Sequence, residues 1–243
     1  MSATAQEPGD LARTHEGKPG LPRGRNRLPA PEVRAVQRER LLRAVVAAVA
    51  ESGYAAVTVA GIVRRARVSR AAFYAHFRGK EDCFLAATSM GGRLLSEQVV
   101  TASRAVPGGA ADEETLRAGV RAFLGFLSGE PAFARVFYID MPAAGAGAAD
   151  RLRAANQHFA WINRTWHERA REHHPEWPAV PGQAYLALAG ATFELVRNLV
   201  RDGRTAELPG LENTLVSLHL AVLAARPWQP AADGLRHELR LGP

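Results

Sequence analysis

Cysteine is almost absent, since Cys83 is the single one among 243 residues. A lone cysteine excludes a disulfide within the chain, and with it the class of small secreted domains that disulfides hold together. Long apolar runs are also missing, because the stretch Leu41–Ala50 is interrupted by Arg43 and is too short to cross a bilayer. The N-terminal residues have no apolar segment typical of a secretory signal. We therefore expect a cytoplasmic protein without a membrane partner.

The alternation of apolar and polar residues that marks β-strands is not found anywhere in the sequence. Apolar residues instead recur at helical spacing, between glycines and prolines that end helices. The pattern predicts an all-α fold of about nine helices. Residues 142–149 are expected to be a loop or a frayed helix end. The expected helices cover residues 31–52, 59–66, 70–77, 80 to just before Pro107, 112–128, 131–141, 150–173, 181–204 and 208–225.

The formal net charge of the chain is +7, and the excess of positive charge is concentrated in the first third of the sequence. Residues 1–89 contain 15 Lys and Arg against 8 Asp and Glu, whereas residues 90–243 contain 16 of each kind. A basic segment joined to a neutral body is typical of a nucleic-acid-binding module on a carrier domain. A solvated basic surface is the alternative interpretation.

The expected second and third helices are short and are separated by a tight turn. Gly53 is placed to end the first helix, while Thr58 and Ser69 are placed to cap the second and third. Phe73 and Phe77 lie one helical turn apart and are expected in the core. Three such helices describe a helix-turn-helix, whose last helix enters the major groove of DNA.

Residues 41–86 resemble the DNA-binding domain of the TetR family of transcriptional regulators. The resemblance is carried by Gly53-Tyr54, Thr58, Val68-Ser69, the run from Phe73 to Phe77, and Lys80-Glu81-Asp82. It implies an N-terminal helix-turn-helix domain and a helical C-terminal domain that binds a ligand and forms a homodimer. It also implies a regulator that is not an enzyme and has no cofactor.

The resemblance further implies which side chains meet DNA. Bases are read by the first residues of the third helix, here Ser69, Arg70 and Ala71, and Arg70 can form two bonds to guanine. Tyr74 and His76 match positions that contact the backbone or base edges, with packing as the alternative. Lys80 matches a phosphate contact at a helix N-terminus, where phosphate is favoured.

Two positions depart from the family pattern. Arg67 stands where a glycine usually precedes Val-Ser, so a positive φ there would cost roughly 1 kcal/mol unless the turn adjusts. Arg67 could instead add a phosphate contact. Gly61 stands where the family often has an acid, so the reciprocal capping box with Thr58 is lost. We count Thr58 and Arg67 among the candidate DNA contacts.

The first 28 residues are rich in Gly, Pro and Arg and are expected to form a flexible basic arm. Arg25 and Arg27 could enter the minor groove beside the helix-turn-helix. The alternative is a tail that adds only non-specific attraction. The expected domains are the arm 1–28, the DNA-binding domain 29–90, the ligand-binding and dimerisation domain 91–226, and a tail 227–243.

Aromatic and scattered polar residues of the middle helices are candidates for a ligand pocket, with ordinary core packing as the alternative. They are Phe126, Phe137, Tyr138, Met141, Phe159, Asn163, Trp166, Tyr185 and Phe193. The last two long helices could pair with their symmetry mates as a four-helix bundle. Candidate interface positions are Ala187, Ala191, Leu195, Leu215, Leu218 and Val222.

Signals for catalysis and metal binding are weak. His167-Glu168 begins a zinc-protease pattern, but Arg171 stands where the second histidine is required. His173 and His174 are better explained by a favourable interaction with the dipole at a helix C-terminus. The expected function is a repressor released from a palindromic operator by a small molecule of unknown identity. The alternatives are a non-specific DNA-binding protein and an all-helical enzyme with an incidental helix-turn-helix.

Overall fold

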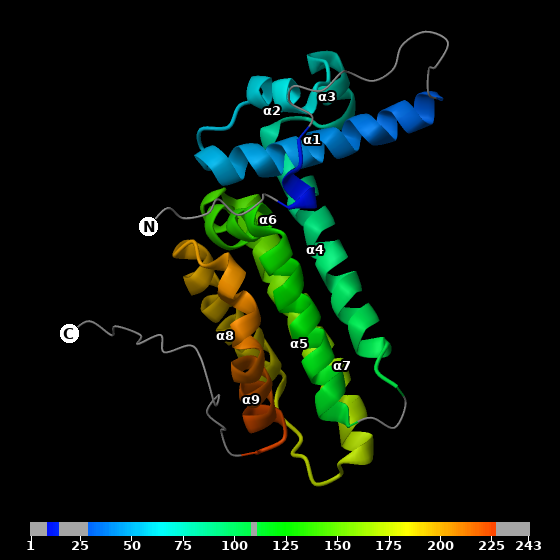
Figure 1. The fold of residues 1–243 in the computed structure, drawn as a ribbon, viewed down its shortest axis with the longest axis vertical. Coiled ribbons are helices and arrows are strands. Elements are labelled where there is room, and N and C mark those ends of the chain that lie inside the picture. Colours follow the sequence, from blue (N-terminus) through cyan, green and yellow to red (C-terminus); the bar gives the residue numbers. More distant parts are fainter. Residues whose placement is uncertain (1–8, 15–28, 108–110, 227–243) are drawn as a thin grey trace, which may run out of the picture.

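The computed structural model describes residues 9–14, 29–107 and 111–226. Throughout these residues the chain forms helices and turns and no strand, as predicted. The three helices of the DNA-binding domain gather at one end of an elongated molecule, and the remaining helices form a longer body (Figure 1). The predictions for Arg25, Arg27 and the tail 227–243 lie outside the described residues.

The DNA-binding domain consists of α1 (Ala30–Ser52), α2 (Val59–Ala66) and α3 (Arg70–His76). Gly53, with φ 77°, ends α1. The two predicted caps are present: Thr58 Oγ1 accepts the N–H of Gly61, and Ser69 Oγ accepts the N–H of Ala72, each at 3.1 Å. Each bond satisfies one of the free N–H groups at a helix start, which is why these short helices begin where the sequence predicts.

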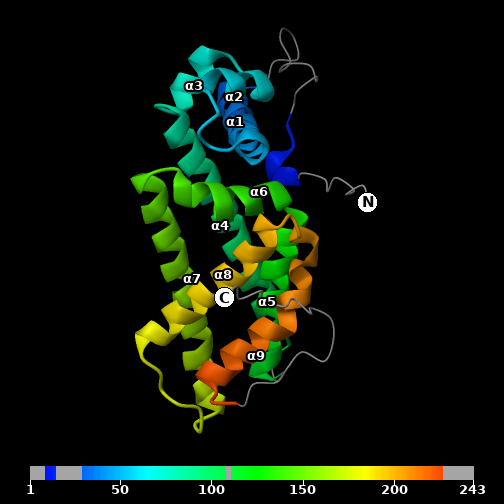
Figure 2. The same ribbon diagram turned by 90° about the vertical axis from the view of Figure 1, so that its left-hand side faces the viewer.

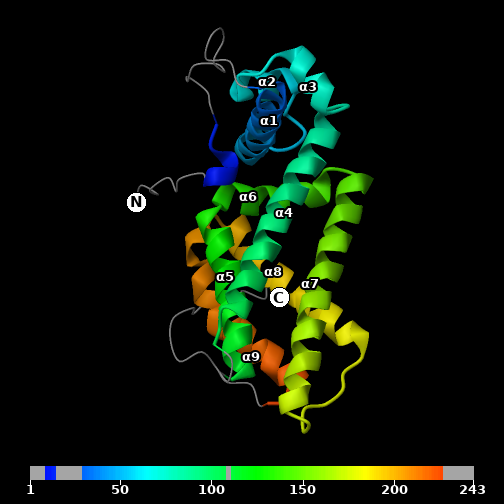
Figure 3. The ribbon, with the colours of Figure 1, turned by 90° about the vertical axis from the view of Figure 1, so that its right-hand side faces the viewer.

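The body contains six α-helices. Helix α4 leaves the DNA-binding domain and runs beside α5 along the molecule, with α7 next to it (Figure 3). Helices α8 and α9 cross α7 obliquely (Figure 2). Their bounds are α4 (Lys80–Arg104), α5 (Asp112–Gly129), α6 (Pro131–Arg135), α7 (Ala146–His173), α8 (Gly182–Arg201) and α9 (Glu212–Leu223). No helix of the described residues is long and apolar enough to span a membrane.

Four boundaries in the described body differ from the sequence prediction. Helix α6 ends at Arg135, and the predicted helix 131–141 continues as a π-helix over Val136–Asp140 and a 3₁₀ turn over Met141–Ala143. Helix α7 begins at Ala146 rather than at Asp150, because Ala148 is buried and Gly147 lies against the first turn of α4. Helix α8 ends at Arg201, just before Gly203, which has a positive φ. Residues Thr205–Leu211 then form a 3₁₀ segment, so that α9 begins at Glu212 rather than at Leu208.

Part of the expected flexible arm is instead packed on the body. Asp10–Ala12 forms a 3₁₀ turn in which Leu11 and Ala12 are buried against α1 and α6. The Glu130 carboxylate accepts the N–H groups of Asp10 and Leu11, each at 2.9 Å. Gly9 has φ 77°, and a Cβ there would meet Glu130 at 2.3 Å. These partners lie about 120 residues away in sequence, so local composition could not reveal them.

Helix α4 is held to α5 and α6 by small residues. A Cβ on Gly119 of α5 would lie 2.7 Å from Ser103 Oγ on α4, so these helices approach closely. Gly91 on α4 receives the ring of Phe133 from α6, and a Cβ there would lie 2.1 Å from a ring carbon. Gly91 therefore fixes where α4 passes α6, at the junction of the two domains.

The neighbouring glycines of α4 provide a matched pair for testing this junction. Gly91→Ala should destabilise the protein by about 1–3 kcal/mol, because the buried Phe133 ring must move. Gly92→Ala should stabilise it by up to about 1 kcal/mol, because no atom lies within 4 Å of its Cβ and alanine favours a helix. Urea unfolding measures both. Equal effects would show that α4 does not depend on this contact.

Candidate DNA-binding surface and ligand cavity

Helix α3 has one buried face and one exposed face. Phe73 and Phe77 are buried, which confirms them as core residues. On the other side Ser69, Arg70, Ala71 and Tyr74 are exposed. These four residues together form what we call the reading face.

The reading face is shaped by one aromatic contact. Tyr74 is 49% exposed, an unusual state for a large aromatic side chain in a folded domain. The Arg70 guanidinium lies 5.8 Å from the centre of its ring, which orients the arginine without burying it. Both side chains therefore remain free to meet a groove.

His76 lies at the edge of α3, beside two arginines of α1. Burial lowers its pKa, and the charges of Arg38 and then Arg34 lower it further. Arg38 also lies 5.5 Å from the centre of the Phe77 ring. Neither arginine was among the candidate DNA contacts, although their spacing of four residues on a basic helix was a usable signal. Together they extend positive charge from the reading face along α1.

Lys80 is engaged within the protein. Its Nζ donates to the backbone carbonyl of Tyr54 at 2.9 Å and lies 4.3 Å from the centre of the Tyr54 ring. The contact ties the first residue of α4 to the turn that follows α1. In this structure Lys80 thus positions α4, and its contact with phosphate stays a prediction.

Arg67, at the end of α2, adopts the left-handed conformation with φ 54° and ψ 43°. The family pattern has glycine at this position, and the positive φ of Arg67 shows the backbone conformation that glycine favours there. The turn does not adjust to remove the strain. The side chain of Arg67 is exposed near the start of α3, which keeps a phosphate contact available.

A cavity of about 500 Å³ lies in the body, lined by residues of α4, α5, α7, α8 and α9. This volume is in the range of small-molecule sites. Six of the predicted pocket residues line it: Phe137, Tyr138, Phe159, Asn163, Trp166 and Phe193. Val99, Val100, Ser103 and Arg104, from the last turns of α4, also line it and were not predicted.

Three predicted pocket residues lie elsewhere. Met141 is only 1% exposed and is packed in the core. The Phe126 ring packs edge-on against Phe133 at 6.0 Å. Tyr185 belongs to a separate cluster, where its hydroxyl is 2.8 Å from Nδ1 of His167. Their placement in the pocket is wrong because helical spacing identifies an inward face without showing which inward residues meet empty space.

The cavity also has buried polar groups, of which His219 and Thr192 were not among the predicted residues. His219 is 4% exposed, and its Nδ1–H donates to the Leu215 carbonyl at 2.7 Å. Burial lowers the pKa of His219, so the ring is neutral and Nε2 is left as an acceptor. Burial also raises the pKa of Tyr138, which keeps its phenol protonated. The Thr192 hydroxyl is buried without a partner among the described residues.

The exposed faces of α8 and α9 carry apolar residues. Leu186 is 47% exposed and Val222 is 38% exposed. Ala187 is exposed, and the candidates Ala191, Leu195 and Leu218 are partly buried. Leu215 is 1% exposed and lines the cavity, so its placement in an interface is wrong. Leu186 was missed because the predicted face was centred one residue further along α8.

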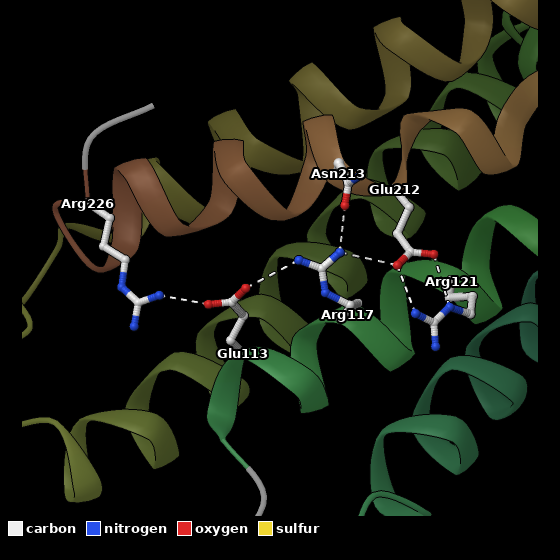
Figure 4. A network of polar contacts seen from close by, with 6 residues as sticks. All are labelled: Glu113, Arg117, Arg121, Glu212, Asn213 and Arg226. Atoms are coloured by element: carbon white, nitrogen blue, oxygen red, sulfur yellow. Dashed lines mark hydrogen bonds and ion pairs between the residues drawn. The ribbon is translucent and has the colours of Figure 1, made fainter. Parts of the chain in front are cut away.

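A chain of ion pairs joins α5 to α9 (Figure 4). Arg121 forms two bonds to Glu212, at 3.0 and 2.9 Å, and Arg117 reaches the same carboxylate at 3.3 Å. Glu113 accepts from Arg226 at 2.7 Å. The hydrogen bond from Arg121 is the main cause of the lowered pKa of Glu212. The network fixes α9 against the helix that forms one wall of the cavity.

The described residues contain no group of three His, Cys, Asp or Glu side chains suited to a metal ion. His167 is buried between aromatic rings, with the Trp177 ring stacked at 6.1 Å. At the end of α7, Nδ1 of His173 lies 3.1 Å from Oδ2 of Asp112. His173 therefore has a carboxylate partner in addition to its position at a helix C-terminus, which the sequence predicted.

Comparison with known proteins identifies the domain. Residues 41–87 match the family described as bacterial regulatory proteins, tetR family. The fold is similar to that of a TetR-like transcriptional regulator from Rhodococcus sp. RHA1, with a TM-score of 0.60 at 23% identity over 82% of this chain and 100% of that one. The helix-turn-helix domain is thus that of the TetR family of transcriptional regulators.

Two further structures are similar to this chain over most of its length. The fatty acid degradation regulator FadR from Bacillus halodurans has a TM-score of 0.66 at 18% identity, over 77% of this chain and 98% of that one. FadR from Bacillus subtilis, in complex with stearoyl-CoA, has a TM-score of 0.64 at 17% identity, over 75% and 97%. No curated protein sequence matches the chain. At these identities the likeness establishes the fold of the body.

The strain at Arg67 can be measured directly. Arg67→Gly should stabilise the protein by about 0.5–1 kcal/mol, because glycine removes the left-handed penalty and loses part of the gain to its greater backbone entropy. Arg67→Ala keeps the strain and should give no gain. Urea unfolding compares the two. If alanine stabilised as much as glycine, the left-handed turn would not be the cause.

The buried histidines predict a pH dependence of stability. His167 and His219 have lowered pKa values, mainly because of burial. As the pH falls, these side chains therefore take up protons more readily in the unfolded chain than in the folded one. Stability should therefore fall as the pH drops below about 6.5, by at most about 1.4 kcal/mol per pH unit for each histidine. Denaturation at pH 7.5 to 5.5 should give a shallower slope for His219→Asn than for the wild type. Parallel profiles for wild type and His219→Asn would contradict this.

Proposed function

We propose that this protein is a homodimeric TetR-family repressor that leaves a palindromic operator when a small molecule occupies the cavity. The observation that carries the proposal is the path of α4. Its first residue, Lys80, is bonded to the DNA-binding domain, and its last turns line the cavity. One helix therefore belongs to both sites.

The reading face supports sequence-specific binding. Arg70, at the start of a capped helix, can contact guanine, and Ser69, Ala71 and Tyr74 lie beside it on the exposed side. Thr58, Arg67, His76 and Lys80 surround this face and are proposed to hold the DNA backbone. Arg34 and Arg38 of α1 join them on the basis of their position beside His76.

The exposed apolar residues of α8 and α9 support a dimer. Leu186 and Val222 would be covered if these helices packed against the same helices of a second copy. A two-fold dimer presents two reading faces, which must lie about 34–36 Å apart to enter successive major grooves. A palindromic operator follows from that symmetry.

Ligand release would work through this spacing. A molecule between α4 and α7 would push the Val99–Arg104 end of α4, and the Lys80 end would turn the DNA-binding domain with it. To move the population almost completely, the ligand must favour the released form by about 5.5 kcal/mol. The Bacillus subtilis FadR structure holds stearoyl-CoA, which supports a small-molecule ligand for a protein of this fold.

Selection of random duplexes by the purified protein at about 150 mM salt tests the proposal. A palindromic sequence should be enriched. Arg70→Ala should lose about 1–3 kcal/mol of discrimination at one base pair in each half-site. Arg93→Ala removes an exposed arginine of α4 outside the reading face, so it should change nothing. No enriched sequence, with affinity set by salt alone, would indicate a non-specific DNA-binding protein and contradict the repressor.

A further inference from the structure

The arginines of the body differ in whether they have partners. Most are satisfied within the chain, as Arg164 is by Glu168 at 2.7 Å and Arg197 is by Glu194 at 2.8 Å. Within residues 91–107 and 111–226, only three arginines have no hydrogen-bond or ion-pair partner: Arg93, Arg104 and Arg169. Two of these three, Arg104 and Arg169, line the cavity.

The two arginines come from different helices. Arg104 lies in the last turn of α4 and Arg169 lies in the second half of α7, and both are exposed to solvent. Because they are exposed and also line the cavity, they lie where it opens. Both side chains therefore add positive charge to the exposed part of the cavity wall.

The described cavity wall has one acid against these two arginines. Among the described lining residues Asp112 is the single acid. Its Oδ2 atom lies 3.1 Å from Nδ1 of His173 and 3.4 Å from Nε2 of His174. The opening therefore has an excess of positive charge, whereas other arginines of the body meet carboxylates of the same chain.

The rest of the cavity is largely aromatic and aliphatic. The rings of Phe123 and Phe159 meet edge-on at 5.5 Å, and Tyr138 stacks on Phe193 at 4.6 Å. All four rings line the cavity. Such walls favour an apolar body, since burying apolar surface gains roughly 25 cal/mol per Å².

We propose, on the basis of the function proposed above, that the ligand of this cavity is an amphipathic anion. Its acidic group is held by Arg104 and Arg169, and its apolar part lies among Phe123, Phe159 and Phe193. Arginine suits either a carboxylate or a phosphate, because its planar group forms two parallel hydrogen bonds to such an anion. Since Arg104 belongs to α4, the anion acts directly on the helix that carries the DNA-binding domain.

Binding of three probes to the full-length protein without DNA tests this assignment. Dodecanoate and dodecyl phosphate carry the anion, and dodecanol has the same chain without it. Trp161 and Trp166 line the cavity, so their fluorescence reports occupancy. At least one anionic probe, used below its micelle concentration, should bind at least tenfold more tightly than dodecanol. The preferred anion distinguishes a carboxylate from a phosphate ligand.

Substitution of the arginines then separates a specific site from general attraction. Arg104→Gln and Arg169→Gln should each weaken the anionic probe about tenfold and leave dodecanol unchanged. Arg93→Gln, which removes the third unpartnered arginine outside the cavity, should have no effect. Thermal unfolding verifies that each variant is folded. Equal binding of dodecanol and both anions, an equal effect of Arg93→Gln, or no binding of any probe would overturn the assignment.

Operator binding in the presence of the preferred probe distinguishes this inference from the function on which it rests. If the probe binds through Arg104 and Arg169 but leaves operator affinity unchanged, the proposed ligand class is supported and the proposed ligand-induced release is contradicted. If a cationic or uncharged molecule releases the operator and the anions do not bind, release stands and the ligand class fails.

Discussion

Helix α4 runs without a break for 25 residues and is part of both the DNA-binding domain and the cavity wall. At its start, Lys80 is bonded to Tyr54 in the turn that follows α1. In its middle, Gly91 receives the Phe133 ring, and near its end Ser103 lies against Gly119 of α5. A helix is stiff along its axis, so a displacement at one end is transmitted to the other. The orientation of the reading face thus depends on how α4 is seated.

Electrostatics divides the molecule into two kinds of surface. In the DNA-binding domain, Arg70 of the reading face and Arg34 and Arg38 of α1 add exposed positive charge. In the body, arginines and acids pair with each other, as in the network of Arg117, Arg121 and Glu212. Three arginines of the described body, Arg93, Arg104 and Arg169, depart from that rule, and the last two are found at the cavity. Unpaired charge therefore marks both proposed binding sites.

The sequence predicted best what depends on near neighbours. The caps at Thr58 and Ser69, the buried Phe73 and Phe77, and the left-handed Arg67 each follow from contacts or conformations within a few residues. Six of the nine candidate pocket residues line the cavity, four of them from α7 and α8 and two from Val136–Asp140.

What the sequence could not predict depends on distant partners. The capture of Asp10 and Leu11 by Glu130 joins segments about 120 residues apart. Lys80 has the right type and place for a phosphate contact, yet the Tyr54 carbonyl holds it in the free protein. Leu215 and Met141 face inward at helical spacing, and only the packed structure shows which of them meets the cavity. His219, one of several polar residues of α9, gave no local signal at all.

The claim that α4 links the cavity to the DNA-binding domain is tested most directly by filling the cavity from the α4 side. Val100→Trp places a bulky ring on that wall, and a spin label attached through Ala56→Cys, an exposed position outside the reading face, reports the distance between the two DNA-binding domains of the dimer. Cys83 is buried and should not react with the label. The account predicts that Val100→Trp changes this distance and weakens operator binding together. An unchanged distance and affinity in a folded Val100→Trp protein would contradict it.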